Sequence, residues 1–174
     1  MAKTLIAFFS RRDENYVGIS KEYLNVGITE TAVEKIRELI DADVFQITMK
    51  KPYSREYEAC MKESKEDLDN NARPELASMP QSIDACDTVI LAYPNYWDTM
   101  PMAVFTFLEA FDFSGKRILP LCTNEGSDLG RSVQDIIKTC PGADVKPGLS
   151  LAGCGIDSAK PHIERWLRLN GLIK

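Results

Sequence analysis

Short apolar runs alternate along this chain with stretches in which apolar residues recur at helical spacing. Apolar runs bounded by charged or turn residues are typical of strands buried on both faces of a parallel sheet. The predicted strands are residues 4–9, 43–48, 87–92, 117–122 and 148–153. The predicted helices cover roughly residues 29–40, 55–68, 102–111, 133–140 and 158–170. This alternation predicts an α/β fold whose parallel sheet carries helices on both faces, joined by right-handed crossovers.

Several positions make this prediction more specific. Thr31 and Glu34 form a capping-box pattern at the first helix, and Ser158 is expected to cap the last one. Pro120 lies inside a predicted strand, which is a mild objection to a central position for that strand. Residues 102–111 are apolar on nearly every face, so we expect a helix that is buried on both sides or lies at a subunit contact, which makes a homodimer possible.

Composition narrows the class of protein. The chain has 174 residues, a size that predicts a single domain over residues 1–174. A net charge of −5 and 44% apolar residues give no basic footprint, so nucleic acid is not an expected partner. No apolar run approaches the length that crosses a bilayer, so no membrane association is expected.

The cysteines and the histidine bear on compartment and chemistry. The chain has five cysteines, widely spaced and never in a CxxC pair, and no signal peptide precedes the first predicted strand, so we expect free thiols in a reducing cytoplasm. The single histidine, His162, leaves little material for a zinc site or a histidine-based triad. We therefore expect no metal site and no catalytic side chain, and we assign any catalysis to a cofactor.

Three strand-end loops are unusual. The first contains Ser10 and, after residues 11–25 with no helical period, Gly27 at a helix start, where free amides and the helix dipole favour an anion. The loop at residues 93–101 is rich in aromatic residues and proline, and it suits either a planar ligand or plain core packing. The loop at residues 123–127 supplies hydroxyls and a glycine. Because such loops meet at the carboxyl edge of a parallel sheet, they predict a site for a phosphorylated planar cofactor.

The loops together carry a family resemblance. The motifs are Phe9-Ser10-Arg11-Arg12, Val26-Gly27-Ile28-Thr29-Glu30, Pro52-Tyr53 with Tyr57, Pro94-Asn95-Tyr96-Trp97, Met100-Pro101 and Thr123-Asn124-Glu125-Gly126-Ser127. In this order, from Leu5 to Leu172, they resemble the bacterial flavodoxin-like proteins that bind flavin mononucleotide (FMN). The resemblance implies a three-layer sandwich around a five-stranded parallel sheet in the order 2-1-3-4-5. It also implies non-covalent FMN and either electron transfer or flavin-dependent reduction.

The resemblance also implies roles for individual residues. The expected phosphate-loop hydroxyls are those of Ser10, Thr29 and Thr31. One side of the isoalloxazine is expected to meet Tyr93, Pro94, Asn95, Tyr96 and Trp97, with Trp97 as the stacking ring. The other side and the ribityl chain are expected to meet Thr123, Asn124, Glu125, Gly126 and Ser127.

The chain departs from the family pattern in several places. Ile28 stands where the phosphate loop commonly has asparagine, and Asp98 and Asp128 stand where glycine is common. A carboxylate at Asp98 would disfavour an anionic reduced flavin. Residues 11–26 form an insertion that splits the usual phosphate loop. Within it, Arg11 can pair with a phosphate or be a solvated loop charge.

Three functions follow from these features. The first is an FMN-binding electron carrier whose partner is a redox protein or NAD(P)H. The second is an NAD(P)H-dependent FMN or quinone reductase on the same fold, which needs space for a second planar substrate over the ring. The third, motivated by the three departures, is a flavin-free interaction module. The sequence does not decide whether the protein is an enzyme.

Overall fold

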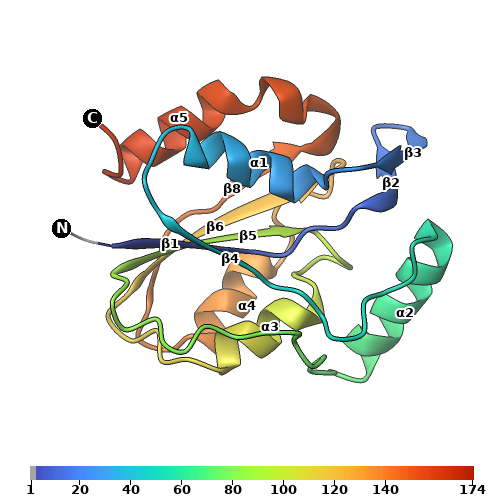
Figure 1. Ribbon diagram of the computed structural model, residues 1–174, viewed down its shortest axis with the longest axis horizontal. Helices are drawn as coiled ribbons and strands as arrows, with labels where there is room; N and C mark the ends of the chain where they lie inside the picture. Colours follow the sequence, from blue (N-terminus) through green and yellow to red (C-terminus); the bar gives the residue numbers. More distant parts are fainter. Residues whose placement is uncertain (1–2) are drawn as a thin grey trace.

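The protein is built around a parallel β-sheet (Figure 1). A computed structural model describes residues 3–174. The sheet runs in the order β4-β1-β5-β6-β7, and β8 also pairs with β6. Its strands are β1 (Thr4–Phe8), β4 (Asp43–Gln46), β5 (Thr88–Pro94), β6 (Arg117–Asn124), β7 (Asp144–Val145) and β8 (Leu149–Ala152).

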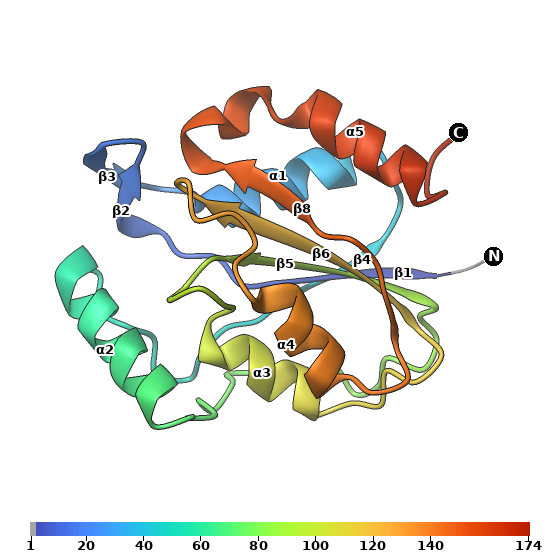
Figure 2. The ribbon, with the colours of Figure 1, turned by 180° about the vertical axis from the view of Figure 1, so that it is seen from behind.

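Helices cover both faces of the sheet. One face carries α1 (Ile28–Arg37) and α5 (Lys160–Leu169), and the other carries α3 (Met102–Glu109) and α4 (Ser132–Thr139) (Figures 1 and 2). Helix α2 (Tyr57–Asp69) stands to one side of α3, and the short 3-10 helix η1 (Gly153–Ser158) leads into α5. The predicted α/β class, with a parallel sheet between helical layers, is confirmed.

The predicted strand arrangement is confirmed only in part. A sheet of five strands in the order 2-1-3-4-5 was expected, but the sheet has six strands, because β7 and β8 share the outer position beside β6. β6 pairs with β7 at Arg117 and Ile118 and with β8 from Leu121 to Asn124. Pro120, which has no amide hydrogen, lies where the outer ladder is interrupted. A proline is thereby accommodated in a strand that has neighbours on both sides.

The insertion folds as a β-hairpin. Strands β2 (Asp13–Val17) and β3 (Ser20–Leu24) form a separate antiparallel two-stranded sheet. In both views the hairpin and the first turns of α2 lie at the same end of the molecule, opposite the chain termini (Figures 1 and 2). The carboxyl ends of β5 and β6 point toward this end, so the hairpin belongs to the functional edge of the sheet.

Two apolar clusters fill the space between the layers, one on each side of the sheet. Helix α3 belongs to the first, and six of its eight residues are buried within the chain. The apolar character of α3 is explained by packing within its own chain. It therefore no longer supports a homodimer, which stays a prediction.

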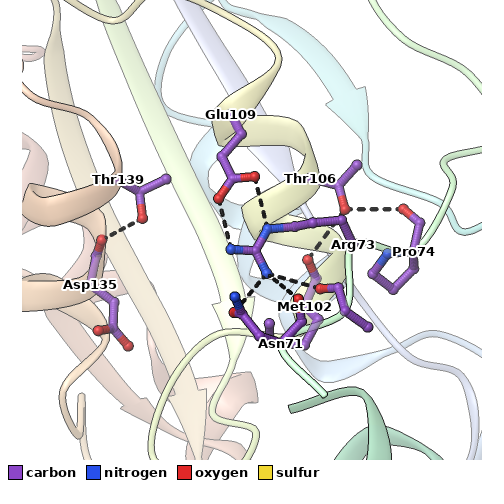
Figure 3. Close-up of polar contacts among 9 residues, drawn as sticks. Asn71, Arg73, Pro74, Met102, Thr106, Glu109, Asp135 and Thr139 are labelled. Carbon is purple, nitrogen blue, oxygen red and sulfur yellow. Dashed lines mark hydrogen bonds and ion pairs between the residues drawn. The ribbon is translucent and has the colours of Figure 1, made fainter. Parts of the chain in front are cut away.

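An arginine fastens the connection before β5 to α3 (Figure 3). The Arg73 guanidinium donates two hydrogen bonds to the Glu109 carboxylate, at 2.8 and 2.7 Å, and lies 5.2 Å from the centroid of the Phe105 ring. Thr106 Oγ1 donates to the Pro74 carbonyl at 3.0 Å. The long segment between α2 and β5 is thus attached to the core without secondary structure of its own.

Both predicted helix caps are wrong. Thr31 lies inside α1, where its hydroxyl donates to the Gly27 carbonyl, and Gly27 is the N-cap residue. The hydroxyl of Ser10 accepts a hydrogen bond from the Glu30 amide at 3.0 Å and so does the work of a capping side chain from outside the helix. Ser158 lies in η1, which runs into α5 through a helical Ala159.

Within residues 3–174, no helix is both long enough and apolar enough to cross a membrane. The same residues contain no group of three or more histidine, cysteine, aspartate or glutamate side chains arranged to hold a metal ion. All five cysteines are free thiols, and only Cys154 is exposed.

Candidate functional site

A cavity of about 420 Å³ opens at the carboxyl ends of β1, β5 and β6. This volume lies within the range of about 300–1,000 Å³ that is usual for small-molecule sites. The expected site residues that line it are Thr29, Pro94, Asn95, Tyr96, Trp97, Thr123, Asn124, Glu125 and Ser127. The three loops singled out in the sequence therefore meet around one hollow.

Four expected site residues are not among those that line the cavity. Ser10 and Thr31 hydrogen-bond to the first turn of α1, as described above. Tyr93 is fully buried, and its hydroxyl donates to Ser132 Oγ at 2.9 Å. The Gly126 amide donates to Asn124 Oδ1 at 2.9 Å, inside the fourth-strand loop. These four contribute to the shape of the loops.

The start of α1 forms the polar end of the cavity. The Glu30 amide is bonded to Ser10, and the Thr31 amide donates to the Gly27 carbonyl, whereas no hydrogen bond within residues 3–174 uses the amides of Ile28 and Thr29. Free amides at a helix N-terminus bind anions. A Cβ on Gly27 would lie 2.1 Å from Ser10 Oγ, so only glycine allows this approach of Ser10.

Charged side chains surround this helix start. The carboxylate of Glu30 would repel an anion, but Arg12 pairs with it through two hydrogen bonds, at 3.3 and 2.9 Å. Glu125 lies nearby, and among residues 3–174 its carboxylate accepts one long hydrogen bond, from the Cys154 amide at 3.4 Å, and forms no ion pair. Its charge therefore works against binding a phosphate at this end.

A buried hydroxyl pair joins this end to the sheet. Thr29 Oγ1 and Thr123 Oγ1 lie 2.7 Å apart, and both residues are almost fully buried. The pair links the first turn of α1 to the end of β6. Each buried hydroxyl thus has a hydrogen-bond partner in the other. The bond fixes the start of α1 relative to the fourth-strand loop.

The aromatic loop contains a strained turn. Trp97 and Asp98 both have left-handed backbones, with φ of +55° and +70°, and the backbones of Tyr96 and Thr99 bond to each other across the turn. For residues other than glycine, the left-handed conformation costs about 1–2 kcal/mol each. Strain of this kind persists only where the surroundings impose it.

Polar contacts from neighbouring elements impose this turn. The Asp98 amide donates to Asn95 Oδ1 at 3.0 Å, and its carbonyl accepts from the Arg131 amide at 2.8 Å. Thr99 Oγ1 donates to the Asp135 carboxylate of α4 at 2.5 Å. The backbone that carries the Trp97 ring is therefore held by the N-terminal part of α4.

The Trp97 ring lies at the edge of the cavity. Its Nε1 donates to Ser64 Oγ of α2 at 3.0 Å, and 36% of the residue is exposed. Lys65 Nζ lies 5.9 Å from the ring centroid. A half-exposed indole with its polar atom already satisfied is suited to contact a planar ligand.

The fourth-strand loop is organised by Asn124. Its Oδ1 accepts from the amides of Gly126 and Asp128, at 2.9 and 3.0 Å, and its Nδ2 donates to Ser150 Oγ at 2.8 Å. Asn95 Nδ2 donates to the Asp128 carbonyl at 3.0 Å, which joins this loop to the aromatic loop. Asp128, like Asp98, has a left-handed backbone. Both positions, where glycine is common in the family, therefore have the backbone conformation that glycine favours.

The cavity is also lined by residues that were not among the expected site residues, most of them from the insertion and α2. The additional lining residues are Arg11, Asn15, Tyr16, Ile28, Tyr57, Cys60, Met61, Ser64, Asp98 and Gly153. The signal available in the sequence was an insertion between two halves of a predicted anion loop, with an arginine at its start and aromatic residues within it.

Burial keeps two titratable groups of the cavity lining, Cys60 and Tyr96, neutral. Burial raises the pKa of the Cys60 thiol, and it raises the pKa of the Tyr96 hydroxyl well above its usual value. A thiol and a phenol that stay protonated at neutral pH are poor nucleophiles or bases. The lining carries a platform for a planar ring and an anion-binding end, but no acid–base pair.

Comparison with known proteins identifies the family. The model of the flavodoxin family (Flavodoxin_4) matches residues 19–169, which is most of the chain. No curated protein matches the sequence. Among solved structures, a protein of Bacteroides eggerthii designated a flavoprotein is 26% identical, with a TM-score of 0.77 over 97% of this chain and 98% of its own.

Two further structures share the fold. A second such protein, from Bacteroides uniformis, is 25% identical with a TM-score of 0.75, over 94% of this chain and 98% of its own. A Lactobacillus acidophilus flavoprotein crystallised with FMN is 16% identical with a TM-score of 0.66, over 95% of this chain and 99% of its own. The resemblance seen in the loops is confirmed, and the chain belongs to the flavodoxin family.

Proposed function

We propose that this protein binds one FMN non-covalently in the cavity and acts in electron transfer. The single observation that carries the proposal is the pairing of two features in one cavity: the free amides of Ile28 and Thr29, and the Trp97 ring. The first suits a phosphate and the second suits a flat ring system.

The residues present fit FMN. Its phosphate would be held by the α1 amides. The Ser10 hydroxyl, which accepts from the Glu30 amide, keeps its own hydrogen to donate to a phosphate oxygen. Loops 93–98 and 123–127 would flank the ring system, and Asn95 fixes their separation. Ile28 offers no side-chain polar group, so the backbone carries the phosphate contact.

Electron transfer needs no acid, base or nucleophile from the chain. FMN, when bound, supplies the reversible uptake and release of electrons. The protein's residues bind it, keep one side of it away from water and set the charge around it. Asp98 and Glu125 place two negative charges in the lining, and Arg11 places one positive charge there.

The same fold also serves enzymes. An NADH:FMN oxidoreductase and an FMN-dependent NADH-azoreductase of Bacillus anthracis share it, at 16% and 15% identity. Similarity of fold at this level of identity does not distinguish an electron carrier from a reductase. An experiment has to make that distinction.

The test uses protein loaded with FMN under anaerobic conditions. With NADH or NADPH and no added enzyme, we expect little reduction of the bound flavin. After chemical reduction, we expect the flavin to be reoxidised by an added electron acceptor such as cytochrome c. Sustained NAD(P)H oxidation by the protein alone would replace the carrier proposal with the reductase one. Protein that does not bind added FMN would support the flavin-free alternative.

A further inference from the structure

Arg11 and the first half of α2 build the side of the cavity that the flavin loops do not occupy. We call the hairpin residues 11–17 and the α2 residues 57–64 the insertion wall. In Figures 1 and 2 both elements stand at the same end of the molecule. Their cavity-lining residues are Arg11, Asn15, Tyr16, Tyr57, Cys60, Met61 and Ser64.

The Arg11 guanidinium is held by main-chain carbonyls. Its terminal nitrogens donate to the carbonyls of Ser54 at 2.9 Å and Arg55 at 2.8 Å, and to that of Glu14 in the hairpin. Among residues 3–174 it forms no ion pair with a carboxylate, whereas its neighbour Arg12 pairs with Glu30. Carbonyl oxygens satisfy the donors but do not cancel the net charge.

The insertion wall therefore presents a fixed positive charge to the cavity. A guanidinium remains charged at any ordinary pH. The charge acts on its surroundings: Cys60 lies close enough that Arg11 partly offsets the rise that burial causes in the pKa of its thiol. Nε of Arg11 makes no hydrogen bond within the described part of the chain, which leaves one donor for a ligand.

An aromatic pair lies beside this charge. The rings of Tyr16 and Tyr57 meet edge to face, with centroids 4.8 Å apart and planes at 70°. Tyr16 is 40% exposed although it lines the cavity, and Met61 continues the apolar surface along α2. Aromatic and thioether side chains in this arrangement suit the face or edge of a flat ring.

The insertion wall is anchored in place. The Glu14 carboxylate accepts from the Tyr57 amide at 2.8 Å and so caps α2 from the hairpin. The Glu14 amide donates to the Arg55 carbonyl at 3.3 Å, and Lys21 pairs with Glu58 at 2.8 Å. Five polar contacts, counting the two of Arg11 to Ser54 and Arg55, join the insertion to α2 and its preceding loop, so the surface is formed in advance of any ligand.

We propose that the insertion wall is a second subsite of the cavity, which binds a planar aromatic ligand bearing an anionic oxygen group next to the FMN ring. Arg11 meets the anionic group, and Tyr16 with Tyr57 meets the ring. The inference rests on the proposed function, because it takes the rest of the cavity to hold FMN. A ligand in this subsite is placed to exchange electrons with the flavin.

We assign the FMN phosphate to the start of α1 and a different anionic group to Arg11. The anion-binding amides belong to α1, whereas the Arg11 side chain extends to the carbonyls of residues 54 and 55, before α2. The two ends thus offer two anion-binding positions in one cavity. A single FMN has one phosphate to fill them.

The test measures equilibrium binding to the FMN-loaded protein by calorimetry. The probes are a sulfonated naphthoquinone, which is planar and anionic, and uncharged naphthoquinone. We expect Arg11→Gln to weaken binding of the sulfonated probe by about tenfold or more, and that of the uncharged probe by less than about twofold. Arg37→Gln is the matched control, since this exposed arginine pairs with Glu34 on α1 and does not line the cavity, and it should leave both affinities unchanged.

A second variant controls for the possibility that Arg11→Gln weakens binding by loosening the hairpin. Tyr16→Leu keeps every Arg11 contact and should weaken both probes to a similar extent, because it removes the ring surface. FMN affinity is measured in every variant by absorbance, so failure of the proposed function, in which the unmodified protein binds no FMN, is seen separately. The subsite is refuted if both probes bind Arg11→Gln as tightly as the unmodified protein. It is also refuted if Arg11→Gln loses FMN itself while Tyr16→Leu leaves both probes unaffected.

Discussion

Gly130 offers the sharpest test of how the aromatic turn is held. Its backbone is left-handed, with φ of +51°, and a Cβ built on it would lie 2.4 Å from the Asp98 carbonyl oxygen. That oxygen is not free to move, because it accepts a hydrogen bond from the Arg131 amide at 2.8 Å. Gly130→Ala should therefore both strain the backbone and displace the turn that carries Trp97.

The magnitude follows from the two effects. A left-handed alanine costs about 1–2 kcal/mol, and forcing a methyl group against a backbone atom adds about 1–3 kcal/mol. We expect Gly130→Ala to lose about 2–5 kcal/mol of unfolding free energy. Gly115→Ala is the matched control, since this glycine also has a positive φ, of +75°, and nothing lies within 4 Å of its Cβ position. It should lose only the backbone part, about 1–2 kcal/mol.

Urea unfolding measures both losses, and an FMN titration shows whether the turn has moved. Gly130→Ala should also bind FMN more weakly, while Gly115→Ala should bind it normally. Equal losses of stability in the two variants, with equal FMN affinities, would refute the idea that the Asp98 carbonyl is clamped between Gly130 and Arg131.

Two further predictions concern single side chains. Trp97→Ala should weaken FMN binding by about 1–3 kcal/mol if the ring stacks on the flavin, and Trp97→Phe, which keeps a ring, should recover most of that loss; an unchanged dissociation constant for the alanine variant would remove Trp97 from the site. Glu109→Gln should cost about 0.5–1 kcal/mol of stability at neutral pH, because the neutral amide loses the ion pair and can accept only one of the two Arg73 hydrogen bonds. Those bonds lower the pKa of Glu109 in the folded state, so the pair stabilises fully above the unfolded-state value of about 4.3 and is lost as the pH falls through the folded value. The difference between the unmodified protein and the variant in urea should accordingly shrink as the pH is lowered, and a constant difference would count against the pair.

Local patterns predicted most of the fold. The apolar runs and helical periods placed the strands of the main sheet and the five α-helices, because each of these segments buries one face or both. The exceptions depend on contacts made far along the chain. The break between β7 and β8 lies beside Pro120 of the neighbouring strand, and the cap of α1 comes from Ser10 instead of Thr31.

The candidate site divides in the same way. The three loops could be found because each follows a predicted strand, and parallel strands bring such loops together. The insertion wall could not be placed, because its position depends on Arg11 reaching two carbonyls more than forty residues away. The left-handed backbones of Asp98 and Asp128 had one sign in the sequence, since glycine is common at both positions in the family, but the contacts that hold them come from distant residues.

The most direct test of the account is a titration of the purified protein with FMN, followed by visible absorbance. We expect saturation at one FMN per chain, with the flavin bands shifted from those of the free cofactor, and weaker binding in the Trp97→Ala variant. A spectrum that stays that of free FMN at every ratio of protein to flavin would contradict it.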